Sequence, residues 1–122
     1  MMKKILIVDD EPSILRLLSK RLKDIGYETF TANDGYQCIK ITREVKPDLI
    51  LLDLQMPAGG GVHAFENLKA SVYTSMIPII FITAFQKKEA KQLIIEMGAD
   101  GFIPKPINFS ELLKMIKKLI GE

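Results

Sequence analysis

The chain has 122 residues, of which 48% are hydrophobic and 26% are charged, and its formal net charge at pH 7 is +2. This composition is typical of one folded domain spanning residues 1–122 and excludes a disordered chain. The charge is too small to indicate nucleic-acid binding. The single cysteine, Cys38, cannot form an intrachain disulfide, so we expect a reducing, cytoplasmic setting. No segment is apolar for long enough to predict a membrane span, and the first residues do not form a signal peptide.

The first half of the chain alternates short apolar runs with amphipathic segments. The β-branched run Lys4–Val8 is typical of a strand buried on both faces. Pro12 suits the first turn of a helix whose leucines repeat at helical spacing, and Gly26 is expected to end that helix. The next expected elements are a strand, a helix and a third strand, over Tyr27–Thr31, Gly35–Val45 and Asp48–Asp53.

The second half continues the same alternation. We expect a short helix, a strand, a longer helix and a short strand, over Val62–Ser71, Pro78–Ile82, Lys87–Met97 and Gly101–Pro104. Gly98 is the expected stop of the longer helix. Asn108 and Glu111 have the spacing of a capping box at the start of a last helix. The buried face of that helix is expected to include Leu112, Ile116 and Leu119.

Five strands that alternate with five helices predict an α/β fold, in which a parallel sheet is covered by helices on both faces. In such sheets ligands bind beyond the carboxyl ends of the strands. Four of the expected strands have polar side chains at this end, namely Asp9 and Asp10, Asp53, Thr83, and Lys105. We therefore expect three carboxylates, one hydroxyl and one ammonium group to meet at one edge of the sheet.

This set of groups predicts phosphoryl chemistry. Three neighbouring carboxylates repel one another, and a hard divalent ion such as Mg²⁺ relieves the repulsion by binding their oxygens. A carboxylate can also act as a nucleophile that forms an aspartyl phosphate. Asp9 and Asp10 would supply a metal site for phosphoryl transfer to Asp53. Lys105 would supply the neutralising cation and Thr83 the hydroxyl donor.

Four segments carry a family resemblance, in the order "ILIVDDEP", "DLILLDLQMPAGGG", "PIIFITA" and "GADGFIPKP". With these segments the whole chain resembles the response-regulator receiver domains of two-component signalling, such as the single-domain regulators of chemotaxis and sporulation. The resemblance implies a flavodoxin-like (βα)5 fold with strand order 2-1-3-4-5. It also implies a signalling domain rather than an enzyme, although such a domain catalyses its own phosphorylation and dephosphorylation.

The resemblance assigns roles to the residues at the strand ends. Asp53 would be the phosphoacceptor, and Mg²⁺ would be held by Asp9, Asp10, Asp53 and the backbone carbonyl of Gln55. Thr83 and Lys105 would hold the phosphoryl group. The Lys105–Pro106 peptide bond would be cis, and Phe102 would be the aromatic residue that switches with phosphorylation.

The resemblance also implies partners. A histidine kinase or a histidine phosphotransfer protein would donate the phosphoryl group. The fourth helix, fifth strand and fifth helix would then present a changed surface to a downstream target or to an output domain outside this chain. We expect no direct contact with nucleic acid or with a membrane. The chain is either a stand-alone regulator or a piece of a longer protein.

Four residues depart from the family pattern or lie at positions that vary within it. Gly59-Gly60 stands where the family commonly has Met-Asp or Met-Ser, so the loop after the acceptor is less restrained here. Gln55 and Phe85 occupy positions thought to tune the lifetime of the phosphoryl group through water access. A bulky Phe85 would shield it.

Each residue also has an interpretation without phosphoryl chemistry. Asp9 and Asp10 would favour the N-terminus of the next helix, Thr83 would be an ordinary strand residue, and Lys105 an ordinary surface lysine. Phe102 fits a core position as well as it fits a switch. Cys38 is expected to pack inertly and His63 to begin a helix, exposed. The exposed lysines are expected to form solvated faces or a partner surface, namely Lys87, Lys88, Lys91, Lys114, Lys117 and Lys118.

Three other functions share this architecture. A flavodoxin-like FMN carrier needs a hydroxyl- and glycine-rich loop after the first strand, but Asp9-Asp10-Glu11 would repel a phosphate that brings no metal. A phosphatase with an aspartate nucleophile needs a general acid two residues later, and Gln55 cannot serve as one. A degenerate receiver, which binds partners without phosphorylation, remains an alternative.

Overall fold

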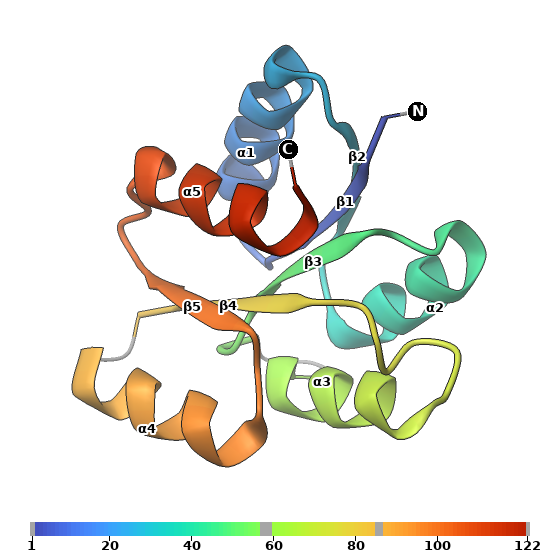
Figure 1. The fold of residues 1–122 in the computed structure, drawn as a ribbon, viewed down its shortest axis with the longest axis vertical. Helices are drawn as coiled ribbons and strands as arrows, with labels where there is room; N and C mark the ends of the chain where they lie inside the picture. Colours follow the sequence, from blue (N-terminus) through green and yellow to red (C-terminus); the bar gives the residue numbers. More distant parts are fainter. Residues whose placement is uncertain (1, 57–59, 85–86, 122) are drawn as a thin grey trace.

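The computed structural model describes residues 2–56, 60–84 and 87–121. Five strands and five helices alternate along the described chain, in the order β1 (Lys4–Val8), α1 (Pro12–Ile25), β2 (Glu28–Ala32), α2 (Gly35–Val45), β3 (Leu49–Asp53), α3 (Gly61–Ala70), β4 (Ile79–Thr83), α4 (Lys87–Met97), β5 (Gly101–Pro104) and α5 (Phe109–Ile120). Figure 1 shows this alternation along the ribbon. No described helix is both long enough and apolar enough to cross a membrane.

The strands form one parallel sheet in the order β2-β1-β3-β4-β5, which confirms the predicted fold class and strand order. The pairing register aligns the carboxyl ends of the central strands. Val8 pairs with Leu52, Asp53 pairs with Ile82, and Thr83 pairs with Pro104. The sheet therefore presents the ends of β1, β3, β4 and β5 along a single edge.

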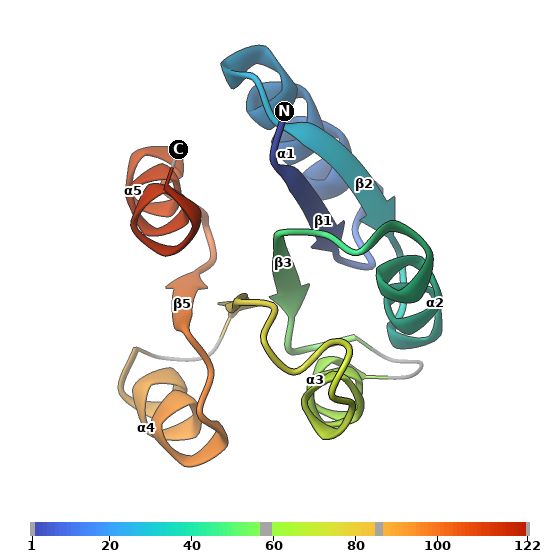
Figure 2. The ribbon, with the colours of Figure 1, turned by 45° about the vertical axis from the view of Figure 1, so that its right-hand side comes forward.

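Helices cover both faces of the sheet, as Figures 1 and 2 show. Strand residues alternate between two apolar clusters, because successive side chains of a strand point to opposite faces. One cluster joins Leu6 and Ile50 to Cys38 of α2 and Phe65 of α3. The other joins the intervening strand residues to α1 and α5, and contains Ile5, Ile7, Leu49, Leu51, Leu18, Leu22, Leu112 and Ile116. All residues of β3 and β4 are buried, as expected for central strands of a parallel sheet.

Most predicted element bounds match, and four are shifted by one residue. Strands were predicted one residue early at Tyr27, Asp48 and Pro78, and α3 was predicted one residue late. The amide of Tyr27 donates to the carbonyl of Leu22, so it belongs to the end of α1 rather than to the next strand. Pro78 has no N–H group to donate to a sheet ladder, which suits a position just before a strand.

Helix ends follow the capping chemistry of the sequence. Gly26 ends α1 at φ 120°, in the left-handed region that favours glycine, and its N–H donates to the carbonyls of Leu22 and Lys23. Asn108 caps α5, because its side chain accepts a hydrogen bond from the N–H of Glu111 at 3.0 Å. The predicted buried face of α5 is confirmed at Leu112 and Ile116, whereas Leu119 is partly buried.

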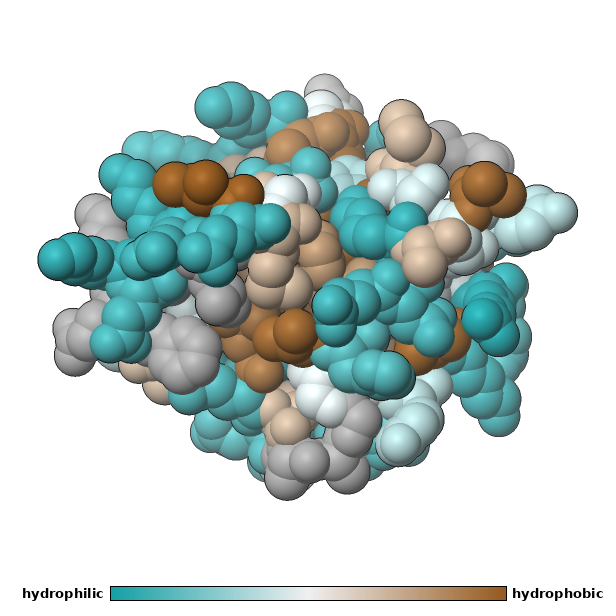
Figure 3. Space-filling view, turned by 90° about the horizontal axis from the view of Figure 1, so that it is seen from below, coloured by the Kyte–Doolittle hydropathy of each residue, from teal (hydrophilic) through white to brown (hydrophobic). Residues whose placement is uncertain are grey.

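One face of the molecule shows how polar and apolar side chains are distributed around α3 and α4. Seen from below, the face that carries α3 and α4 is largely hydrophilic, and its hydrophobic side chains form separate patches (Figure 3). Single exposed apolar side chains are normal on the surface of a folded protein.

Candidate functional site

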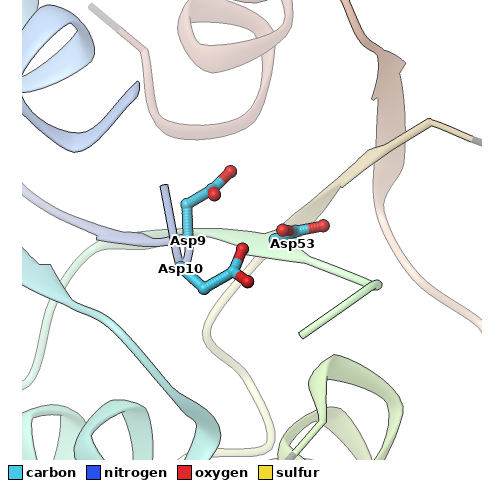
Figure 4. A group of neighbouring side chains, drawn as sticks. All are labelled: Asp9, Asp10 and Asp53. Carbon is cyan, nitrogen blue, oxygen red and sulfur yellow. The ribbon is translucent and has the colours of Figure 1, made fainter. Parts of the chain in front are cut away.

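Three carboxylates meet where β1 and β3 end. Asp9 and Asp10 directly follow β1, and Asp53 is the last residue of β3. One carboxylate oxygen from each of the three lies within 4.8 Å of the others. Figure 4 shows the three side chains beside one another at these strand ends. Asp9 and Asp53 are 0% and 1% exposed, whereas Asp10 is open to solvent.

One ammonium group bridges the carboxylates. Nζ of Lys105, just beyond β5, lies 3.1 Å from Oδ2 of Asp9 and 3.4 Å from Oδ2 of Asp53. It also lies 2.9 Å from Oε1 of Glu11, at the start of α1. The sequence predicted that Lys105 would join the acidic group, but it did not identify Glu11 as a partner. The only available signal was the third acid in the run "DDE".

The two buried carboxylates also hold the turns that follow their strands. Oδ1 of Asp9 accepts the N–H of Glu11 at 2.9 Å, and Oδ1 of Asp53 accepts the N–H of Gln55 at 3.0 Å. An aspartate that bonds to the backbone two residues later makes a compact turn. In each residue Oδ1 therefore fixes the local backbone, while Oδ2 faces Lys105.

Burial and mutual repulsion shift the proton affinities of this group. Burial raises the pKa of Asp53 to about 6; the charge of Asp9 adds to the rise, whereas the N–H of Gln55 and the Lys105 ammonium oppose it. The pKa of Asp9 is also raised, chiefly by burial. Burial alone would lower the pKa of Lys105, but hydrogen bonds to Glu11 and Asp9 and the charge of Asp53 outweigh this effect and raise it. Lys105 therefore stays protonated.

The predicted hydroxyl and the predicted aromatic residue lie on neighbouring strands. Thr83 ends β4, one position beyond the residue that pairs with Asp53, and its side chain is buried. Its carbonyl accepts the N–H of Lys105 at 2.8 Å, which ties the ends of β4 and β5 together. The Lys105–Pro106 peptide bond is cis, as the family resemblance implied. Phe102 in β5 is partly buried and packs against the apolar cluster beneath α2, α3 and α4.

Gln55 makes a side-chain contact that the sequence did not reveal. Its Oε1 accepts the N–H of Ala84 at 3.1 Å, and this bond joins the turn after β3 to the end of β4. The role of the Gln55 carbonyl as a metal ligand stays a prediction. The expectations for Phe85 and Gly59 lie outside the described residues.

Close backbone packing requires a glycine at position 61, where α3 begins. A Cβ atom built at Gly61 would lie 2.0 Å from the carbonyl oxygen of Asp53 and 2.8 Å from Cα of Leu54. These atoms are backbone, so they cannot move aside cheaply. The first turn of α3 therefore packs directly against the segment that carries Asp53, and any larger residue would displace it.

The acidic group fits a hard divalent cation. Its donors are carboxylate oxygens, which Mg²⁺ prefers, and the open side at Asp10 would leave room for bound waters. Burial is the main cause of the raised pKa values of Asp9 and Asp53, and a cation bound beside them would favour their charged forms. Among the described residues, Asp9, Asp10 and Asp53 therefore form a group that could hold such an ion.

The remaining residues of interest occupy ordinary positions. Cys38 is fully buried in the core, and burial raises the pKa of its thiol to about 12, which favours an unreactive thiol. His63 is exposed in the first turn of α3, as predicted. The predicted lysines whose side chains the structure describes are exposed, namely Lys88, Lys91, Lys114, Lys117 and Lys118.

Comparison with known proteins gives a consistent result. The family model for the response regulator receiver domain matches residues 5–117. The polar-differentiation response regulator DivK of Brucella anthropi is 33% identical over 122 residues, which cover 100% of this chain and 99% of DivK. The solved structure of the chemotaxis protein CheY4 of Vibrio cholerae has a TM-score of 0.90 and 33% sequence identity, covering 98% of this chain and 99% of that one.

A longer relative matches over only part of its length. The alkaline phosphatase synthesis transcriptional regulatory protein PhoP of Bacillus subtilis is 38% identical over 120 residues. The match covers 98% of this chain but 49% of PhoP, so the chain spans about half the length of that relative. The similarity to PhoP is therefore a similarity to part of a larger protein.

Proposed function

Because the chain belongs to the response regulator receiver domain family, we propose that it accepts a phosphoryl group on the carboxylate of Asp53. Receiver domains are signalling domains of two-component systems, and the fold found here is the flavodoxin-like fold of the chemotaxis protein. The observation that carries the proposal is the buried Asp53 carboxylate, which shares one ammonium group with Asp9 beside a third acid. Residues 1–122 would act as one receiver domain.

The proposed reaction moves a phosphoryl group from a phosphohistidine to Asp53. A carboxylate oxygen forms a bond to phosphorus as the phosphorus–nitrogen bond breaks, and the histidine nitrogen keeps the bonding electrons. Lys105 would neutralise charge on the transferred group from its position 3.4 Å from Asp53. The hydroxyl of Thr83 would donate a hydrogen bond to the same group.

Mg²⁺ is the cofactor that this site would bind, through Asp9, Asp10, Asp53 and the carbonyl of Gln55. When bound, the ion would neutralise charge on the transferring group. It would also favour the ionised form of Asp53, which must be a carboxylate to act as a nucleophile. In this proposal the domain catalyses its own phosphorylation and its own dephosphorylation.

The partners in this proposal are a histidine kinase or a histidine phosphotransfer protein as donor, and a target protein or output domain as receiver of the signal. The signal would pass from Thr83 to Phe102 and change the surface formed by α4, β5 and α5. We place the reaction in the cytoplasm. Neither nucleic acid nor a membrane is a direct partner in it.

An isosteric change at the acceptor tests the proposal. Asp53→Asn should abolish labelling by acetyl phosphate with Mg²⁺, because an amide cannot act as the carboxylate nucleophile. The measurement is the mass gain of one phosphoryl group on the intact protein. Asp48→Asn, at the opposite edge of the sheet, is the matched control and should be labelled like the wild type.

Two results would contradict the assignment. Labelling of Asp53→Asn at the wild-type rate would place the acceptor elsewhere. A wild-type protein that binds Mg²⁺ but is never labelled would favour the degenerate receiver, which acts only by binding partners.

A further inference from the structure

The turn between α3 and β4, residues 71–76, exposes three large apolar side chains. Val72, Tyr73 and Met76 are 82%, 90% and 87% exposed. The other exposed large apolar residues of the described chain are spread over the N-terminus and helices α1 to α4, namely Met2, Leu17, Ile25, Tyr36, Val62 and Ile95. Clustered exposed apolar side chains mark interaction surfaces more often than single ones do.

Hydrogen bonds hold the backbone of this turn in one shape. Nζ of Lys69 donates to the carbonyls of Ser75 and Ile77, at 2.9 and 3.0 Å. The carbonyl of Ser71 accepts the N–H groups of Thr74 and Ser75. Thr74 is buried, and its hydroxyl donates to the carbonyl of Leu68. The apolar side chains are therefore displayed by an ordered backbone, which reduces the entropy lost when a partner binds.

A hollow lies beside the exposed tyrosine. Its volume is about 240 Å³, and it is lined by Thr42, Arg43, Lys46, Ser71, Tyr73 and Thr74. The hollow thus lies between the C-terminal end of α2 and the turn, on the side of the molecule where Figure 1 shows α2. Its volume is several times the ~30 Å³ of one water molecule, so it has room for a side chain.

The charges around the hollow are positive. Arg43 and Lys46 are exposed, and neither belongs to an ion pair within the described residues. Two copies of this face placed against each other would bring like charges together, which disfavours a symmetric dimer here. A hollow that admits one side chain also suits a peptide better than the flat surface of a bilayer.

We propose that the end of α2 and the α3–β4 turn form a docking surface for an acidic peptide segment of a partner protein. Carboxylates of the segment would pair with Arg43 and Lys46, and one apolar side chain would enter the hollow beside Tyr73. This surface lies at the edge where β4 begins, opposite the edge that carries Asp53. The docking is therefore independent of phosphoryl chemistry and would tether the domain to a partner in either state.

A peptide titration tests this surface. The probe is an acetylated, amidated peptide, Glu-Leu-Asp-Phe-Glu-Asp, added to the ¹⁵N-labelled full chain. We expect amide shift changes confined to residues 42–46 and 71–76. Arg43→Glu with Lys46→Glu should weaken binding about tenfold, and Tyr73→Ser should weaken it by a similar factor. The control variants Lys88→Glu and Tyr36→Ser should leave the affinity unchanged, as should beryllofluoride, a phosphoryl mimic.

Several outcomes would overturn the proposal. One is an equal affinity for a probe in which lysines replace the acidic residues. Another is shift changes centred elsewhere, or no binding at all. A third is self-association in sedimentation that Tyr73→Ser abolishes, which would make a second copy the occupant. Binding to phosphatidylserine vesicles in preference to the peptide would make a lipid surface the occupant. The ¹⁵N spectrum of each free variant checks that it is folded.

Discussion

Carboxylates lie both where the parallel strands begin, here called the starting edge of the sheet, and where they end, here called the ending edge. Their roles differ between the two edges. Where the strands begin, Asp48 accepts the N–H of Lys4 at 2.7 Å and Asp100 accepts the N–H of Ile79 at 2.8 Å. Each of these carboxylates satisfies the first amide of a neighbouring strand. Where the strands end, Asp9 and Asp53 are buried against each other and share the ammonium of Lys105.

The comparison shows that position along a strand decides what an aspartate does. Where the strands begin, each carboxylate accepts a backbone N–H of a different strand and stabilises the sheet through a charge-assisted hydrogen bond. At the ending edge they crowd together, and burial raises the pKa of Asp53 to about 6. At the starting edge the backbone N–H groups satisfy the carboxylates, whereas at the ending edge the crowded carboxylates favour the binding of a cation.

The largest effect should be stabilisation by Mg²⁺, which depends on the carboxylates at the ending edge and not on those at the starting edge. A ligand that binds the folded state alone, present at about a hundredfold excess over its Kd, adds about 2.7 kcal/mol to the free energy of unfolding. Asp10→Asn should remove most of this gain in a thermal melt, and the metal-free variant should melt higher than the metal-free wild type because a repulsion is relieved. Asp48→Asn should keep the full Mg²⁺ response. An unaltered response in Asp10→Asn would contradict the metal site.

The second largest effect should be a pH dependence of stability that Asp53 contributes and Asp48 does not. The folded state keeps the proton of Asp53 up to a pH of about 6, whereas an aspartate in the unfolded chain has its ordinary pKa of 3.8. Between these values the folded state binds more protons, so stability is lost as pH rises through the window, by about 3 kcal/mol.

Chemical denaturation with a metal chelator between pH 4 and pH 7 measures this loss. Asp53→Asn should lack it, so that the difference in stability between this variant and the wild type grows with pH. Asp48→Asn should keep the wild-type slope. A constant difference for Asp53→Asn would show that Asp53 titrates normally.

The starting edge should show a smaller and purely structural effect. Asp48→Asn replaces a charged acceptor with a neutral one at the N–H of Lys4, and should cost about 1 kcal/mol of unfolding free energy. The measurement is the midpoint of urea unfolding at neutral pH. A loss of phosphoryl labelling in this variant would contradict the claim that Asp48 has only a structural role.

The smallest effect concerns the readout of phosphorylation. Thr83→Ala should still accept a phosphoryl group, but it should show reduced amide shift changes across residues 87–104 on addition of beryllofluoride, because one contact that favours the active state is gone. Thr74→Ala, which removes a buried hydroxyl far from the site, should keep the full shift changes. Shift changes of wild-type size in Thr83→Ala would leave Phe102 as a core residue only.

The sequence by itself determined the fold and the residues gathered at the ending edge. The short apolar runs of β1, β3 and β4, the stop at Gly26 and the cap at Asn108 are local signals, because they depend on neighbours within a few positions. The alternation of strands and helices then requires a parallel sheet. The order of polar residues at the strand ends places Asp53 and Lys105 at one edge before any contact is known.

Only the tertiary structure decided which side chains touch and with what electrostatic result. Glu11 pairs with Lys105 across 94 positions of sequence, and Gln55 reaches Ala84 across 29. Such contacts depend on the rotamers and on the packing of separate strands, which no local pattern specifies. The raised pKa of Asp53 has the same origin, because burial and the approach of Asp9 arise only when β1 and β3 lie side by side.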